Sequence, residues 1–263
     1  MSLAAGQIHL IRYALAAGPL PPITQALAVG ELARRSVLSR FGGPERLPAP
    51  PSLSGHVGDQ PLRDQHRHAF FLPQDADGDG LLDQLAIWCP DGLEAAALPA
   101  LLSLSGLYPG DGRAGWPLRL LEMSDAAGDL WTPAAEWESV TPFVLSRFPK
   151  QYKDGTPKLN ERGEQRDGPE DQARREWALR QQVEPALPDL VAVEQVPQCV
   201  VRGRPLPWRS FEVGRGPGQG SSSGFVYGLR LRFAGPVGGP VALGFGCHFG
   251  LGLFRSAGTG PGA

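Results

Sequence analysis

The sequence predicts an α+β protein with two ferredoxin-like, RRM-like lobes in tandem and a carboxy-terminal glycine-rich loop. Short apolar segments bounded by Gly and Pro alternate with stretches of helical periodicity. In the first half their order is strand, helix, strand, strand, helix, strand, which is the ferredoxin-like order with both helices on one face of the sheet. The 263 residues suffice for two compact domains, which we place at 1–130 and 131–263.

Periodicity and turn residues predict each element of the first lobe. A short apolar strand over 7–16 ends at Gly18-Pro19. An amphipathic helix follows over 23–40, with arginines near its end, where the helix dipole favours cations. The segments 67–73 and 83–89 flank an acidic Gly turn and predict a β-hairpin. A helix over 93–104 and a strand over 116–123 complete this lobe.

The second lobe is expected to repeat this order less regularly. We predict a strand over 138–146 and a helix over 170–183, then strands near 190–196, 208–213, 225–233 and 241–245. Between the first strand and the helix, residues 147–168 are polar, basic and almost without aliphatic side chains. This composition predicts a mobile insertion.

Composition restricts the class of protein. No apolar run reaches the roughly 20 residues that cross a bilayer, and no signal peptide opens the chain. Cys89, Cys199 and Cys247 lack the paired spacing of a zinc or redox motif. We therefore expect a cytoplasmic protein with reduced thiols and no membrane partner, and neither a cofactor nor a metal site is predicted from the cysteines.

The net charge of −2 conceals an asymmetry between the two halves. Residues 1–146 hold 9 Lys+Arg against 16 Asp+Glu, whereas residues 147–263 hold 16 against 11, so the halves carry −7 and +5. Phosphate binding needs local positive potential and not a basic whole chain. The second half is thus compatible with an RNA-binding face, although ordinary solvated surface charge explains the count equally well.

Two histidines lie at alternate positions where the hairpin begins. In a strand, His66 and His68 project to the same face, because alternate side chains share a side. Two imidazoles there can serve as general acid and base at neutral pH, or as metal ligands with His56 as the nearest further candidate. The alternative is that neither histidine has a chemical role, with one hydrogen-bonded to the backbone and the other exposed to solvent.

The chain ends in a glycine-rich run over 244–252. Its glycines, Gly244, Gly246, Gly250 and Gly252, would let backbone N–H groups approach a phosphate closely. A glycine-rich bulge at a packed interface gives the same pattern. A nucleotide-cofactor site is excluded, because the run has no Gly-Lys-Ser/Thr and no helix with an acidic residue follows it.

Two further motifs have structural and functional readings. The acidic turn over 75–83 resembles the start of a calcium loop, but Ala86 stands where the bidentate glutamate belongs, so we favour a polar hairpin turn. The insertion places basic residues beside Phe148 and Tyr152, which suits phosphate contact and base stacking as well as it suits a solvated loop. The residues we expect to contact RNA here are Lys150, Lys153 and Lys158, with Arg174 and Arg175 on the following helix.

Several of these motifs, in this order, resemble a known family. They are the segments 12–15, 53–55, 66–73, 77–80, 139–143 and 246–252. Together they resemble the Cas-six half of the Cas-five/Cas-six fusion protein of type I-G (formerly I-U) CRISPR systems, within the RAMP superfamily. The likeness extends over nearly the whole chain and implies paired ferredoxin-like lobes with a glycine-rich loop.

The resemblance also implies an activity. Such proteins cut the CRISPR precursor transcript within each repeat, without metal, and hold the guide RNA. The 2′-hydroxyl beside the scissile bond attacks the phosphate, which leaves a 2′,3′-cyclic phosphate and a 5′-hydroxyl. We expect His66 and His68 to be the acid–base pair, with His68 slightly ahead, His248 in reserve and His56 weaker.

The resemblance implies partners as well. We expect repeat RNA, guide RNA, a Cas-five-like module and other type I effector subunits. Since this sequence carries no amino-terminal Cas-five-like half, we expect that half to belong to a separate chain or to a longer protein of which this sequence is a piece. The competing hypotheses are a non-catalytic guide-RNA-binding subunit with the same lobes, and a metal-dependent nuclease centred on His56, His66 and His68.

Overall fold

The chain folds as two compact units in a computed structural model, which describes residues 8–42, 47–62, 66–110, 114–125, 132–214 and 223–258. Unit 1 comprises Met1–Gly128 together with His248–Gly250, and unit 2 comprises Asp129–Cys247 together with Leu251–Ala263. The domain boundary expected at residue 130 lies outside the described residues. No helix among those described is long and apolar enough to span a bilayer.

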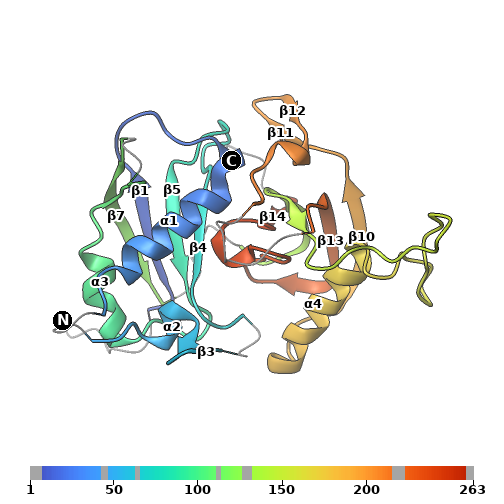
Figure 1. Ribbon diagram of the computed structural model, residues 1–263, viewed down its shortest axis with the longest axis horizontal. Coiled ribbons are helices and arrows are strands. Elements are labelled where there is room, and N and C mark those ends of the chain that lie inside the picture. Colours follow the sequence, from blue (N-terminus) through green and yellow to red (C-terminus); the bar gives the residue numbers. More distant parts are fainter. Residues whose placement is uncertain are drawn as a thin grey trace. The chain divides into compact units, whose positions relative to one another are not determined.

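Unit 1 is an antiparallel sheet with helices packed against it (Figure 1). Its strands lie in the order β4-β5-β1-β7-β6. Without the short edge strand β6, this is the spatial order in which a β-α-β-β-α-β chain forms a ferredoxin-like sheet. The strands are β1 (Leu10–Leu15), β4 (Phe70–Gln74), β5 (Gln84–Trp88), β6 (Gly106–Leu107) and β7 (Trp116–Ser124).

The helices of unit 1 lie where periodicity predicts them. A 3-10 turn, Ile23–Gln25, leads into α1 (Ala26–Leu38), and a second one, Ala95–Ala97, leads into α3 (Leu98–Leu102). The Tyr13 hydroxyl of β1 donates to the carbonyl of Leu101 over 2.8 Å, which fixes α3 on the sheet. Two small elements were not predicted: the one-turn helix α2 (Pro51–Ser54) and the hairpin of β2 (His56–Val57) and β3 (Gln60–Pro61).

A glycine in the middle of α1 explains how His248–Gly250 packs in unit 1. A Cβ at Gly30 would meet the backbone carbonyl oxygens of Phe249 and Phe71. Glycine in a helix interior costs about 1 kcal/mol relative to alanine. Here the missing side chain lets α1, β4 and the segment His248–Gly250 approach one another closely.

Unit 2 contains a second antiparallel sheet, in the order β10-β13-β8-β14, with β9 paired to β13. Its main strands follow the chain order and spatial order of unit 1, and a single long α-helix, α4 (Pro169–Val183), covers the sheet. The stretch before β14 has no second α-helix and contains only the 3-10 turn Cys247–Phe249. Trp177 of α4 packs on Phe233 with ring centroids 4.5 Å apart. The strands are β8 (Ala134–Ser139), β9 (Phe143–Val144), β10 (Leu190–Val196), β13 (Val226–Val237) and β14 (Phe254–Ser256).

Three strand predictions in unit 2 were wrong. The strand expected over 138–146 divides into β8 and β9, because Thr141 and Pro142 interrupt the pairing. The strand expected over 208–213 is a 3-10 turn, Trp208–Ser210, that begins after Pro207. The strand expected over 241–245 is reduced to one bridge, between Ala242 and Leu253. The hairpin of β11 (Cys199–Val201) and β12 (Arg204–Leu206) was not predicted.

The insertion over 147–168 contains no helix or strand but is organised by turns and isolated bridges. Its backbone is paired with itself: the N–H groups of Lys150, Lys158 and Arg166 donate to the carbonyls of Arg166, Lys150 and Lys158, over 2.7 to 3.0 Å. Near the far end of the insertion, Oδ1 of Asn160 accepts from the N–H groups of Arg162 and Glu164 and so stabilises a second turn. Backbone pairing and one polar turn thus organise this segment without aliphatic side chains, and its mobility stays a prediction.

Candidate functional site

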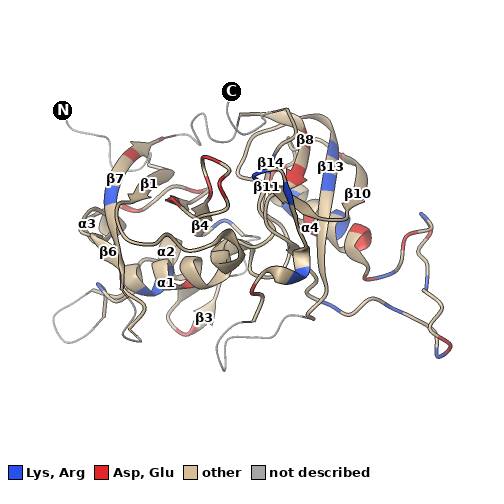
Figure 2. Cartoon of the chain, turned by 90° about the horizontal axis from the view of Figure 1, so that it is seen from above, with Lys and Arg blue, Asp and Glu red and all other residues tan. Residues whose placement is uncertain are grey.

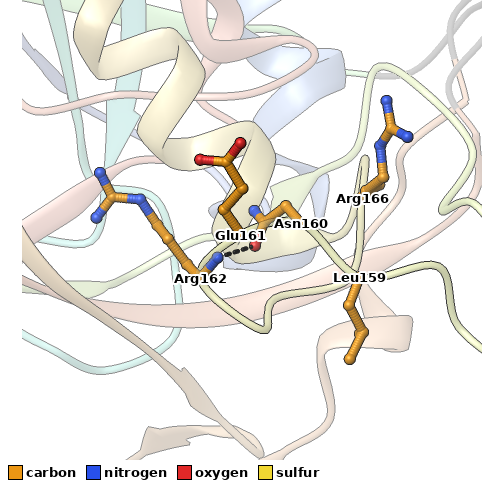
Figure 3. A pocket seen from close by; sticks show the side chains of 5 residues that line it. All are labelled: Leu159, Asn160, Glu161, Arg162 and Arg166. Atoms are coloured by element: carbon orange, nitrogen blue, oxygen red, sulfur yellow. Dashed lines mark hydrogen bonds between the residues drawn. The ribbon is translucent and has the colours of Figure 1, made fainter.

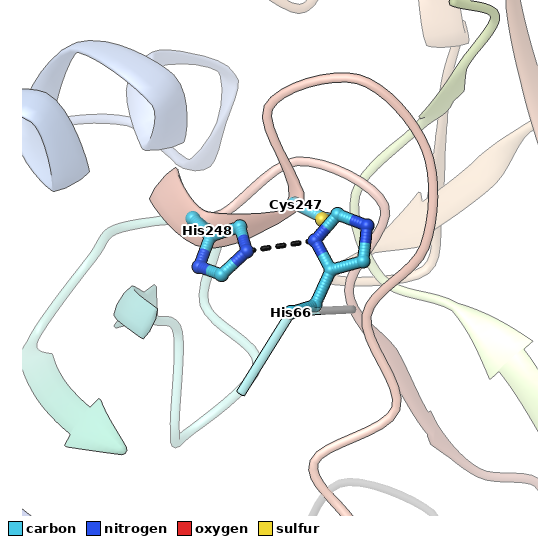
Figure 4. A group of neighbouring side chains, drawn as sticks. All are labelled: His66, Cys247 and His248. Carbon is cyan, nitrogen blue, oxygen red and sulfur yellow. Dashed lines mark hydrogen bonds between the residues drawn. The ribbon is translucent and has the colours of Figure 1, made fainter. Parts of the chain in front are cut away.

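Three histidines meet in unit 1. His66 and His68 lie immediately before β4, and His248 comes from the three-residue segment that packs beside that strand. Nδ1 of His66 is 2.8 Å from Nε2 of His248 (Figure 4). The rings of His68 and His248 are nearly parallel, with centroids 4.1 Å apart. From the sequence, His248 was a further candidate after His66 and His68, and the fold brings it together with both.

The His248 ring is fixed on both faces and at both nitrogens. Phe70 stacks on it with a centroid distance of 4.0 Å, and His68 stacks on it as well. Nδ1 lies 3.1 Å from the carbonyl oxygen of Ala69, and Nε2 bonds to His66. His248 is only 9% exposed. Its orientation is therefore set by packing and by hydrogen bonds together.

These bonds define where the protons lie. A carbonyl oxygen only accepts, so Nδ1 of His248 carries the proton that is shared with Ala69. In neutral His248, Nε2 then holds the lone pair and accepts from Nδ1–H of His66. His66 consequently has its own lone pair on Nε2, and a protonated His248 reverses the donor in this bond. The pair can thus relay a proton between two imidazoles.

Glycine is required beside His68. Gly55 ends α2 in the left-handed region, with φ 69°, and a Cβ there would lie 2.9 Å from Nε2 of His68. The N–H of Ala69 donates to the carbonyl of Ser52 over 2.7 Å, which ties this segment to α2. His66 itself has φ 68°, a conformation that non-glycine residues seldom adopt and that is found at functional sites.

His56 does not join the cluster. It lies exposed in β2, and its Nδ1 bonds to the carbonyl of Ser54 over 2.9 Å. Among the described residues, no group within metal-ligating distance combines His56 with His66 and His68. The metal site that we considered from the sequence, centred on these three, is not formed. Cys247, also drawn in Figure 4, precedes His248 in the chain.

Close packing explains why glycine occupies these positions in the carboxy-terminal run. Gly244, Gly246, Gly250 and Gly252 all have positive φ, from 57° to 91°. A Cβ at Gly244 would lie 2.9 Å from the Phe143 ring, one at Gly250 would lie 2.8 Å from Pro73, and one at Gly252 would meet the carbonyl of Leu243. Their role in RNA binding, which the sequence suggests, remains a proposal beside these contacts.

Helix α4 holds the start of the glycine-rich run in unit 2. Glu176 accepts from the N–H of Gly244 over 2.7 Å, and Arg180, one turn later, donates to the carbonyl of Ala242. Burial raises the pKa of the Glu176 carboxyl, while the bond from Gly244 and the charge of Arg180 oppose this shift. Burial also lowers the pKa of Arg180. Two side chains whose charges are costly to desolvate thus both bond to the backbone of this loop.

The basic residues expected to contact RNA fall into two groups. Arg174 bonds to Glu164 over 2.8 Å and to the carbonyl of Leu190 over 2.6 Å, so it fastens the insertion to the sheet. Arg175 pairs with Asp167 over 2.8 Å. These ion pairs give both arginines a structural function that the sequence analysis missed. Lys150, Lys153 and Lys158 lie on the insertion, where Nζ of Lys150 is 4.0 Å from Asp167 and Lys158 lies over the Tyr152 ring at 5.0 Å.

An open hollow lies in the second turn of the insertion (Figure 3). It has a volume of about 470 Å³ and is lined by Leu159, Asn160, Glu161, Arg162 and Arg166. Leu159 is 58% exposed. The polar atoms of the Asn160 amide are occupied by groups of the turn and by Asp171 of α4. The hollow therefore offers two guanidinium groups, the Glu161 carboxylate and one aliphatic side chain to solvent.

The open face of the second sheet is charge-balanced. At its exposed positions, arginines on β13 and β14 lie beside glutamates on β8 and β10. Figure 2 shows the arginines in blue and the glutamates in red. Arg230 bonds to Glu138 over 2.6 Å, and Arg232 lies opposite Glu136. No aromatic side chain stands at these positions. This face thus lacks the stacking groups with which RRM-type sheets bind single-stranded RNA.

The acidic turn between β4 and β5 is a hydrogen-bonded turn. The carboxylate of Asp75 accepts from the N–H groups of Asp79 and Gly80, and that of Asp83 accepts from the N–H of Ala76. Asp75, Asp77 and Asp79 lie close enough together to hold an ion, but Ala86, at the position of the missing glutamate, is buried in β5. Desolvation raises the pKa of Asp75 and Asp83.

These observations define an α+β protein with two antiparallel sheets, consistent with tandem ferredoxin-like lobes. It carries a histidine cluster at the edge of the first sheet, in which His248 is buried and His66 and His68 are half-buried. No protein-family model and no curated protein sequence matches the chain. Solved structures do resemble it, and the matches include Cas6 proteins, one of which is described as a crRNA endonuclease.

Three of these structures illustrate the likeness. Csf5, a CRISPR-Cas type IV Cas6 crRNA endonuclease, is 16% identical, with 95% of this chain and 99% of that chain covered and a TM-score of 0.36. A Cas6 product complex is 17% identical, with 96% and 99% covered and a TM-score of 0.40. A CRISPR associated protein Cas6 is 7% identical, with 95% and 99% covered and a TM-score of 0.42. Because each TM-score is below 0.5, no residue's role is carried over from these structures.

Proposed function

We propose that this chain is a CRISPR repeat-specific endoribonuclease that cuts precursor transcript into guide RNA without a metal ion and retains the product. The observation that carries the proposal is the bonded and stacked cluster of His66, His68 and His248. The type I-G assignment and the effector partners rest on the sequence resemblance and belong to the same proposal.

The reaction needs one proton removed and one supplied. A base takes the proton of the 2′-hydroxyl, the 2′-oxygen attacks phosphorus, and the bond from phosphorus to the 5′-oxygen breaks. An acid then protonates the leaving 5′-oxygen, so that the products are a 2′,3′-cyclic phosphate and a 5′-hydroxyl. Imidazoles suit both roles because their pKa lies near neutrality.

The cluster supports an assignment of these roles. His66 is the base, since its bond to His248 leaves the lone pair on Nε2. His248 orients His66, as Ala69 in turn orients His248. His68, in its protonated form, is the acid. The His68 ring lies 4.1 Å from that of His248, which bonds to His66, so the proposed acid and base adjoin the same imidazole.

The competing function is a guide-RNA-binding subunit that does not cut. An assay with labelled repeat RNA in EDTA separates the two functions. The proposed enzyme cuts at one position and leaves a cyclic phosphate, and His66→Ala removes cutting while RNA binding persists. Tight binding without cutting by the unmodified protein would establish the binding subunit. Cutting that EDTA abolishes would establish a metal-dependent nuclease.

A further inference from the structure

Two residues of α1, one turn apart, support the histidine cluster at two places. Gly30 and Arg34 lie on the same face of the helix because they are four residues apart. Gly30 packs against the backbone of Phe249, in the segment that carries His248. Nη2 of Arg34 donates to the carbonyl oxygen of Ser54 over 2.7 Å. The same helix face thus contacts both the His248 segment and α2.

Arg34 bonds to the carboxy-terminal end of α2. Gly55, directly after Ser54, has a φ of 69°, and its N–H donates to the carbonyl of Pro51 over 2.9 Å. The last carbonyl groups of a helix have no partner within the helix, and an arginine side chain can satisfy them. The Arg34 guanidinium does this for Ser54. It therefore fixes the backbone where the chain leaves α2 at Gly55.

Helix α2 has a single turn and depends on its surroundings, because the first turn of a helix is unfavourable to form. Leu53 is fully buried, and Glu94 accepts from the N–H of Ser52 over 3.3 Å at an exposed place. The bond from Arg34 is shorter, 2.7 Å, and part-buried, so solvent competes less for it. We expect loss of Arg34 to loosen the end of α2 that carries Gly55.

Other groups fix the backbone on both sides of His68. The thiol of Cys89 donates to the carbonyl of Arg67 over 3.6 Å, and the N–H of Ala69 donates to the carbonyl of Ser52 over 2.7 Å. Neither bond involves the imidazole. The orientation of the ring therefore depends on the groups against which it packs.

The His68 ring packs against His248 and Gly55. Its centroid lies 4.1 Å from that of His248, and a Cβ at Gly55 would lie 2.9 Å from its Nε2 and 3.0 Å from its Cδ2. Protein interiors are close-packed, so a displacement of the Gly55 backbone changes the space that the ring occupies. Because Arg34 fixes the backbone that leads into Gly55, it also sets this side of the imidazole's surroundings.

We propose that Arg34 is a positioning residue for the imidazole of His68 and acts through the backbone of Ser54 and Gly55. The inference deepens the proposed function and rests on it, because the cutting reaction gives the orientation of His68 its consequence. The alternative role for an arginine near a nuclease site is direct contact with an RNA phosphate, which contributes a salt-dependent part of the affinity. Loss of Arg34 affects the cutting rate in the first role and the affinity in the second.

The first measurement needs no RNA. The imidazole carbon–proton NMR signals of His68, identified by their absence in His68→Phe, report the surroundings of this ring. Arg34→Met keeps the length of the stem but has no N–H to donate, so it should shift these signals. Arg35→Met, which removes the neighbouring exposed arginine of α1, should leave them in place, and Arg34→Lys, which keeps a donor, should restore most of the shift. Unmoved His68 signals in Arg34→Met would overturn the proposal.

The second measurement is the single-turnover cutting rate of labelled repeat RNA in EDTA. Arg34→Met should lower it by about ten- to a hundredfold, as a displacement of a reacting group by about 1 Å does, with the RNA affinity unchanged. In the His68→Phe background the same substitution should lower the rate by less than about twofold, because the residue that Arg34 positions is absent. Equal losses in both backgrounds, or weaker RNA binding with a reduced salt slope, would contradict an action through His68.

The outcomes separate this inference from the proposed function. Unmodified protein that binds the RNA without cutting it would overturn the endonuclease, while shifted His68 signals in Arg34→Met would still establish that Arg34 holds this ring. Cutting by the unmodified protein together with unmoved His68 signals would overturn the role of Arg34 alone. The thermal unfolding midpoint shows whether each variant is folded, and Arg34→Gln, with its shorter side chain, provides the same test if Arg34→Met is not.

Discussion

The ring of His248 lies parallel to that of His68, with their planes 4° apart and their centroids separated by 4.1 Å. These residues are 180 positions apart in the sequence and meet because His248–Gly250 packs in unit 1. Through its Nε2, His248 also bonds to Nδ1 of His66. It is the residue that joins the two imidazoles to which we assign acid and base.

His68→Phe distinguishes chemistry from packing. Phenylalanine preserves a flat ring against His248 but cannot carry a proton, so we expect the single-turnover cutting rate to fall by about 10² to 10⁴. The affinity for repeat RNA and the thermal unfolding midpoint should change little. A variant that cuts at nearly the unmodified rate would make His68 a stacking residue only.

His66 and His248 should behave as one unit. We expect His66→Ala and His248→Ala each to reduce the single-turnover rate by about 10² to 10⁴, and the double variant to lose little more than the more damaging single variant. A double-variant cycle measures this coupling. Independent effects, in which the two losses multiply, would show that their hydrogen bond is not used in the reaction.

Gly30→Ala tests the packing of His248–Gly250 on α1. In an ordinary helix this change stabilises by about 1 kcal/mol, whereas here the new methyl group meets Phe249 and Phe71 and should destabilise by roughly 1 to 3 kcal/mol. Urea unfolding measures the sign. Ala28→Gly at an exposed position of the same helix is the matched control, with an expected loss of about 1 kcal/mol. A stabilising Gly30→Ala would contradict the close contact.

Glu176 gives stability a pH dependence with a definite sign. Its folded-state pKa is raised above its unfolded value, so the folded protein binds more protons in that interval and the free energy of unfolding falls as pH rises through it. We expect Glu176→Gln, which keeps an acceptor for Gly244, to reduce this fall and to be at least as stable at pH above neutrality. Urea unfolding on both sides of the interval measures it. An identical pH dependence in the variant would contradict the burial of this charge.

The strands and helices of unit 1 followed from sequence patterns because each has a regular apolar period. The order of β1, α1, β4, β5, α3 and β7 was predicted, with boundaries shifted by a few residues. In unit 2, Pro142 lies inside the segment predicted as a strand over 138–146, and strand pairing is interrupted there. Pro207 immediately precedes the strand predicted over 208–213, where the structure has a 3-10 turn. Local composition also concealed the order in the insertion, where backbone pairing and the Asn160 turn replace an apolar core.

The candidate site was only partly visible in the sequence. The alternate spacing of His66 and His68 predicted a shared face, but nothing local to residue 248 indicates that its ring lies between His68 and Phe70. A signal was present in Gly30, since a glycine inside a good helix points to close approach of another backbone. The positive charge of Arg174 and Arg175 suggested that they contact RNA, whereas the structure shows that both pair with carboxylates.

Cutting of labelled repeat RNA in EDTA, by the unmodified protein and by His66→Ala side by side, tests the central claim most directly. We predict a single cut by the unmodified protein that leaves a 2′,3′-cyclic phosphate, and tight binding without cutting by His66→Ala. No cutting by unmodified protein that binds the RNA tightly, or equal cutting by the two proteins, would contradict the claim that the histidine cluster is the active site of a metal-independent endoribonuclease.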